Sequence, residues 1–138
     1  MPNLTGEFAI ELTVLNVEKS AQWYVDVLDL VVRRESRDEK GHLVHVVLSH
    51  QSGLTLGLVE HGVSTASEFD ERRVGLDHLE FIVPGVEDVH GWVERLDELG
   101  IPHSGAKALD HAAGVMVTFR DPDNIQLEFY ALKPPVRS

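Results

Sequence analysis

The stretch "GLDHLEFIV" at residues 75–83 has a near-copy earlier in the chain, "FAIELTVL" at residues 8–15. When the two stretches are aligned, His78 stands against Ala9. Apolar and polar residues alternate in both, which predicts half-buried strands. The chain therefore repeats one strand and carries the histidine in only one of the two copies.

A second match lies further along the chain. The stretch "GLTLGLV" at residues 53–59 aligns with "NIQLEFY" at residues 124–130, which sets Gly57 against Glu128. Two matches in the same order indicate an internal duplication, and a repeat of this length decides the fold. The fold class expected is α+β, with two tandem βαβββ modules.

Each copy predicts a strand, an amphipathic helix and three further strands. Turn and cap signals separate the elements, such as "DPDN" at 121–124 and Gly100 after the second helix. In the first copy we expect strands at 7–15, 31–36, 42–49 and 54–60 and a helix at 18–28. In the second copy we expect strands at 77–83, 103–109, 114–120 and 125–131 and a helix at 86–99.

The length suits a single domain over residues 1–138. Within it, module one is expected at about residues 6–61 and module two at about residues 75–132. A linker at about 62–74 joins the modules, and the polar tail at 133–138 is expected to fray.

The composition favours a soluble, cytoplasmic protein. Hydrophobic residues make up 43% of the chain, and 12 basic against 23 acidic side chains give a net charge of −11. That balance disfavours nucleic acid and anionic membrane surfaces as partners. No apolar run approaches the length of a membrane-spanning helix. Because the chain has no cysteine, any metal site must use histidine and carboxylate ligands.

The two faces of each predicted sheet differ, because side chains alternate along a strand. In module two, Leu79 and Phe81 belong to an apolar face for the helix to cover, whereas His78 and Glu80 belong to the opposite face. If the two mixed faces curl toward each other, they line a concave cavity for a small ligand. Ligand contacts are expected from Glu11, His45, Gly57, Glu80, Gln126 and Tyr130.

Several motifs resemble those of the vicinal oxygen chelate superfamily, which includes glyoxalases, bleomycin- and fosfomycin-resistance proteins and extradiol dioxygenases. They are "VEKSAQWYVDVLDL" in the first half and "GLDHLEFIV", "ELGIPHSG" and "FRDPDNIQLEFY" in the second. The resemblance covers roughly residues 7–131. It implies paired βαβββ modules that form a curved mixed sheet around a cavity, helices on the outer face, and a homodimer. The modules would pair either within one chain or across the dimer.

The resemblance also implies a metal site with four inward ligand positions, which fall on Ala9, Gly57, His78 and Glu128. Only His78 and Glu128 are ligand types, and a catalytic zinc site typically has three protein ligands. No cofactor is therefore expected; the alternative is a divalent Fe, Mn, Ni or Zn ion. A third ligand could come from His45, or from Glu11 or Glu80 after a local shift. Alternatively, the second halves of two chains could face each other across a twofold axis, so that His78 and Glu128 of both chains give two His and two Glu ligands.

Three functions remain open at this stage. The first is a metal-free protein that binds a small organic molecule in the cavity. The second is a metal-dependent lyase, isomerase or dioxygenase of the glyoxalase or extradiol type, with His78 and Glu128 as ligands. The third is a cofactor-independent enzyme in which His78 and Glu128 act as an acid–base pair. Arg120, beside the "DPDN" turn, is expected to form a turn-stabilising ion pair rather than an anion anchor.

Overall fold

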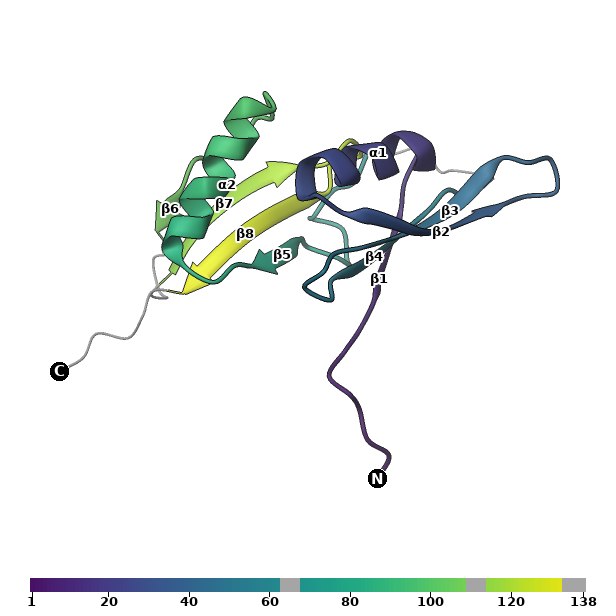
Figure 1. Cartoon of the computed structure of the whole chain (residues 1–138), viewed down its shortest axis with the longest axis horizontal. Coiled ribbons are helices and arrows are strands. Elements are labelled where there is room, and N and C mark those ends of the chain that lie inside the picture. The colour runs from purple at the N-terminus through teal and green to yellow at the C-terminus, as the bar shows by residue number, and fades with distance from the viewer. Residues whose placement is uncertain (63–67, 109–113, 133–138) are drawn as a thin grey trace. The chain divides into compact units, whose positions relative to one another are not determined.

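The computed structural model describes residues 1–62, 68–108 and 114–132. The chain divides into two compact units, Met1–Ser67 and Glu68–Ser138, which contain the stretches predicted as module one and module two. The described part of each unit contains one helix and a four-stranded sheet (Figure 1). Each module is described by itself below.

Module one has a mixed sheet with the strand order β1-β4-β3-β2. β1 runs parallel to β4, and the other neighbours are antiparallel. Its elements are β1 (Ile10–Thr13), α1 (Val17–Leu28), β2 (Val31–Arg37), β3 (Leu43–Ser49) and β4 (Thr55–Val59).

Module two repeats this topology, with the strand order β5-β8-β7-β6 and β5 parallel to β8. The prediction of an α+β fold with two βαβββ modules is confirmed. Its elements are β5 (Leu79–Ile82), α2 (Val86–Glu98), β6 (Lys107–Ala108), β7 (Gly114–Arg120) and β8 (Gln126–Leu132).

The predicted strand at 103–109 is shorter in the structure. Residue 109 lies outside the described residues, and only Lys107 and Ala108 pair with β7 as a strand. His103 keeps a single bridge to Phe119. Its ring accepts from the backbone N–H of Gly105, a residue with φ of +73°, so the chain turns here instead of extending.

The helices begin and end where the local sequence supplies caps. The Asn16 side chain accepts from the backbone N–H of Lys19 at 2.9 Å and starts α1. The Asp88 side chain accepts from the backbone N–H of Gly85 at 2.9 Å at the start of α2. Gly100 follows α2 with a φ of +68°, as the sequence predicts for the residue after the helix.

The core of each module lies between the helix and the apolar face of the sheet. α1 packs on β3 and β4, and α2 packs on β7 and β8, as Figure 1 shows for α2. Trp92 of α2 is half-buried and stacks on Phe129 of β8 with ring centroids 4.1 Å apart. Among the described residues, no helix has the length and apolar character needed to span a membrane. The fully buried side chains include Leu48, Leu56 and Leu58 in module one and Leu96, Val117 and Leu127 in module two.

The strand register repeats between the modules. Glu11 of β1 lies beside Gly57 of β4, and Glu80 of β5 lies beside Glu128 of β8. These two pairs occupy the face opposite the helices, because Leu12 and Leu79, one position away, are buried in the cores. The alignment read from the sequence therefore holds residue by residue at this place.

Candidate metal centre

Three side chains meet where β5 begins beside the middle of β8. His78 lies directly before β5, and its Nε2 atom is 2.8 Å from Oε2 of Glu128. The same nitrogen is 3.3 Å from Oε1 of Glu80. One ligand atom from each of the three residues lies within 4.8 Å of the others. We call this group the His–Glu–Glu centre.

The three side chains of the His–Glu–Glu centre differ in their exposure to solvent. Glu128 is only 3% exposed, whereas the Glu80 side chain is 48% exposed and that of His78 is 26% exposed. A carboxylate that is buried like Glu128 needs a partner to offset lost hydration. The exposed edges of His78 and Glu80 make this the side from which solvent reaches the three side chains.

The acidic surroundings change the proton affinities of the centre. Burial raises the pKa of the Glu128 carboxyl, and the neighbouring Glu80 carboxyl raises it further. Burial by itself lowers the pKa of His78, but contacts with Asp77, Glu80 and Glu128 outweigh it, so that the net change is upward. Protons therefore compete more strongly with a cation for both groups than they would for the free side chains.

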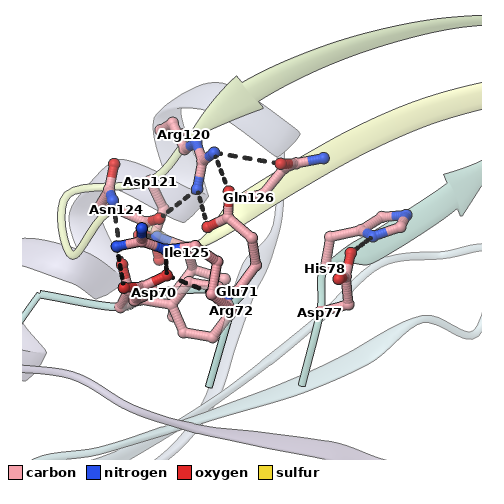
Figure 2. A network of polar contacts seen from close by, with 11 residues as sticks. Asp70, Glu71, Arg72, Asp77, His78, Arg120, Asp121, Asn124, Ile125 and Gln126 are labelled. Carbon is pink, nitrogen blue, oxygen red and sulfur yellow. Dashed lines mark hydrogen bonds and ion pairs between the residues drawn. The ribbon is translucent and has the colours of Figure 1, made fainter. Parts of the chain in front are cut away.

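Asp77 is a member of this site that sequence reasoning missed. Its Oδ1 atom lies 2.6 Å from Nδ1 of His78, as Figure 2 shows. A carboxylate only accepts hydrogen bonds when ionised, so the Nδ1–H of His78 donates to Asp77 and Nε2 faces the two glutamates. A carboxylate directly next to a candidate histidine ligand was the available sequence signal.

The donor set fits a divalent cation. One imidazole nitrogen and two carboxylate oxygens are three ligands, and two carboxylates balance the charge of such an ion. The sequence motifs gave only two ligands, His78 and Glu128. In the structure Glu80 joins them without any shift of β5, because Glu80 is the direct register partner of Glu128.

A second polar network lies at the start of β8. Arg120 donates to both carboxylate oxygens of Glu71, at 2.8 and 3.0 Å, and to Oε1 of Gln126 at 3.2 Å (Figure 2). It also donates to the backbone carbonyl of Asn124 in the turn. Arg120 thus forms the ion pair expected beside "DPDN". The side-chain oxygen of Gln126, a residue expected to contact the ligand, is therefore already engaged by Arg120.

In module one, the equivalent face holds a different arrangement. Oε2 of Glu11 lies 3.1 Å from Nε2 of His45, and the Glu11 carboxylate fills the space above Gly57, where a Cβ atom would overlap it. Ala9, at the position equivalent to His78, is exposed and offers no ligand. The predicted ligand roles of Glu11, His45 and Gly57 stay predictions, as does a contribution of His45 to the metal site.

Tyr130 lies on the same face as Glu128, two residues further along β8. It is half-buried, and its side chain lies over Gly114, where an added Cβ would meet Cε2 of the ring at 2.9 Å and the hydroxyl oxygen at 3.1 Å. Its expected contact with a ligand stays a prediction, and so does the cavity expected between the two mixed faces.

The chain belongs to the superfamily whose model is described as "Glyoxalase/Bleomycin resistance protein/Dioxygenase superfamily", because that model matches residues 8–129. The recognition made from the motifs is confirmed. No curated protein gives a significant match.

Solved structures agree with this assignment. A glyoxylase/bleomycin resistance protein/dioxygenase domain from Frankia sp. EAN1pec is 31% identical with a TM-score of 0.84, and the match covers 97% of this chain and 96% of that one. A glyoxalase family protein from Enterococcus faecalis is 28% identical with a TM-score of 0.71, covering 91% and 98%. The fosfomycin resistance protein FosX from Listeria monocytogenes, solved with Mn(II) and sulfate, shares the fold at 22% identity and a TM-score of 0.68, covering 94% and 93%.

Proposed function

We propose that this protein binds a divalent cation through His78, Glu80 and Glu128 and uses the resulting centre to bind a small organic molecule through its oxygen atoms. The observation that carries the proposal is the convergence of three ligand atoms within 4.8 Å. Three protein ligands are the number that open metal sites typically have. The sequence alone favoured a metal-free binding protein, and the third ligand changes that preference.

The chemistry of the ligands favours Mn²⁺ or Fe²⁺ among the ions expected. Carboxylates suit Mn²⁺, whereas imidazole suits Fe²⁺, Ni²⁺ and Zn²⁺. A site with two carboxylates and one imidazole therefore favours Mn²⁺ or Fe²⁺ over Ni²⁺ and Zn²⁺. The structure of FosX from Listeria monocytogenes with Mn(II) supports Mn²⁺ as the first ion to test.

The side chains of the centre suit different tasks. Glu128 is buried and fixed by His78, so it suits a permanent ligand, whereas the more exposed Glu80 can also exchange a proton with a bound molecule. A bound cation would act as a Lewis acid on an oxygen of that molecule. This division of tasks supports a lyase or isomerase of the glyoxalase type or a dioxygenase.

A cofactor-independent acid–base function is the second candidate. The contact of 2.8 Å between His78 and Glu128 is a direct path for a proton, and the pKa values of both groups are raised above their ordinary values. This candidate needs no cation, so metal binding separates it from the first.

The proposal is tested by calorimetric titration of the metal-free protein with Mn²⁺. We expect one ion per chain with micromolar affinity, and at least about tenfold weaker binding in Glu80→Gln and Glu128→Gln. Glu94→Gln, an exposed glutamate on α2, is the matched control and should bind like the wild type. Absence of binding, or equal binding in all variants, would overturn the metal proposal. The acid–base and metal-free alternatives would then take precedence.

A further inference from the structure

The contact between Asp77 and His78 is short although little burial enforces it. The two atoms, Oδ1 and Nδ1, are 2.6 Å apart, while the Asp77 side chain is 71% exposed. Figure 2 shows the Asp77 carboxylate on the side of the ring that carries Nδ1. An exposed aspartate next in sequence could also point into solvent, and the attraction between carboxylate and imidazole favours the contact over that alternative.

The opposite nitrogen of the ring serves the His–Glu–Glu centre. Nε2 lies 2.8 Å from Glu128 and 3.3 Å from Glu80, so the two ring nitrogens face carboxylates on opposite sides. We infer that Asp77 is a positioning residue, which holds the ring proton of His78 on Nδ1 and turns Nε2 toward the two glutamates. The short contact of Nε2 with Glu128 then contains the carboxyl proton of Glu128, which is the proton that a cation would replace. The consequence for metal binding rests on the proposed function; the assignment of the proton does not.

The physical reason is a competition between two tautomers. A neutral imidazole carries one proton, and without Asp77 the nearest acceptors, Glu80 and Glu128, both attract it to Nε2. A proton on Nε2 blocks that nitrogen as a metal ligand. With Asp77 present, the proton is accepted on the other side, and the carboxylate also makes the ring a stronger electron donor.

The chain contains a matched control for this contact. Oδ1 of Asp97 lies 2.6 Å from Nε2 of His103, while Nδ1 of His103 accepts from the backbone N–H of Gly105. This pair has the same chemistry and the same distance as Asp77 and His78, but it holds the proton on the other nitrogen and takes no part in the centre. Asp97→Asn therefore removes an equivalent carboxylate elsewhere in module two.

The test uses the full chain with ¹⁵N-labelled histidine, without metal and at a pH where His78 is neutral. Long-range ¹H–¹⁵N spectra report which nitrogen carries the proton, and calorimetry with Zn²⁺, which is diamagnetic, reports the affinity. In the wild type we expect the proton of His78 on Nδ1. Asp77→Ala should move it toward Nε2 and weaken Zn²⁺ binding about tenfold, with Asp77→Asn in between. Asp97→Asn should leave both readouts of His78 unchanged.

Two results would overturn the inference: a proton of His78 that stays on Nδ1 in Asp77→Ala, or one that already lies on Nε2 in the wild type. A wild type that binds no Zn²⁺ would refute the proposed metal centre, and the tautomer would still decide the role of Asp77. If the tautomer changes but Zn²⁺ affinity does not, Asp77 orients the ring without influencing the ligand, and the inferred consequence for metal binding fails.

Discussion

Glu80 lies directly beside Glu128 in the parallel register of β5 and β8, as Glu11 lies beside Gly57 in β1 and β4. The duplicated strand pair thus carries two neighbouring carboxylates in one module and a single carboxylate over a glycine in the other. Like charges on directly opposed positions destabilise a sheet unless something offsets them. In module two, His78 offsets part of the repulsion, and a divalent cation would offset the rest.

Replacing Glu128 by glutamine should stabilise the metal-free protein while it weakens metal binding. Burial and the neighbouring Glu80 raise the pKa of this carboxyl because they disfavour its ionised form in the folded protein, and the neutral amide carries no such cost. We expect the free energy of unfolding at pH 7.5 to rise by about 1 kcal/mol and the melting temperature by about 4 °C. Thermal denaturation followed by circular dichroism measures this. A loss of similar size would show that the carboxylate is stabilising.

The stability of the metal-free protein should increase as the pH falls from 8 to 5. The pKa values of both His78 and Glu128 are raised, so the folded state binds protons more tightly than the unfolded chain does. For His78, the stabilisation is complete below its ordinary pKa of 6.5 and is lost as the pH rises through the folded value. In His78→Gln the melting temperature should depend less on pH over this range. Identical slopes in both proteins would contradict the assignment.

Metal binding should have the opposite pH dependence. The ion competes with protons for His78 and Glu128, whose pKa values are raised, so affinity for Mn²⁺ should fall as the pH drops from 8 to 6, by up to about tenfold per pH unit for each displaced proton. Calorimetry at several pH values, in buffers of different ionisation enthalpy, measures both the affinity and the protons released. An affinity that does not change over this range would place the bound ion elsewhere.

The ion pair between Glu71 and Arg120 should lose its stabilising effect in acid. Its hydrogen bonds lower the pKa of Glu71 to about 2, so its stabilisation is present above the ordinary pKa of 4.5 and is lost as the pH falls toward 2. Over that interval the melting temperature of the wild type should fall more steeply than that of Glu71→Gln. Glu68→Gln, which changes an exposed carboxylate nearby, should follow the wild type. Parallel curves for all three proteins would refute the prediction.

An alanine at Gly57 should displace Glu11 from His45. The added Cβ would overlap the Glu11 carboxylate, which lies on an exposed side chain and can rotate into solvent. We therefore expect little change in stability, within about 1 kcal/mol, since alanine also restricts the unfolded chain. The ¹⁵N shifts of the His45 ring should change, whereas Gly91→Ala, with open space around it, should leave them as they are. Unchanged His45 shifts in Gly57→Ala would show that the contact between Glu11 and His45 does not need the space above Gly57.

Much of the fold could be predicted because the duplication gives every pattern twice. The period-two pattern around His78 and the helix signals around Trp92 each had a counterpart in module one, and the predicted order of elements is confirmed. The predicted strand at 103–109 is confirmed only for Lys107 and Ala108, because a histidine and a glycine close a local turn before them. Local hydrogen bonds of this kind leave no mark on hydrophobic periodicity.

The centre could be predicted only in part. Alternation of side chains placed His78, Glu80 and Glu128 on one face, but it could not say that Glu80 and Glu128 are direct partners across the two strands. Register between strands far apart in sequence is set by packing of the whole sheet. The contact of Asp77 depends on where the chain turns before β5, which no periodic pattern describes.

The most direct test of the account is pulsed electron paramagnetic resonance of the protein with one equivalent of Mn²⁺, prepared with ¹⁴N- and ¹⁵N-labelled histidine. We expect the bound ion to show coupling to a single imidazole nitrogen, and this coupling should disappear in His78→Ala but persist in His45→Ala. Bound Mn²⁺ without histidine coupling, or coupling that survives the loss of His78, would contradict the centre formed by His78, Glu80 and Glu128.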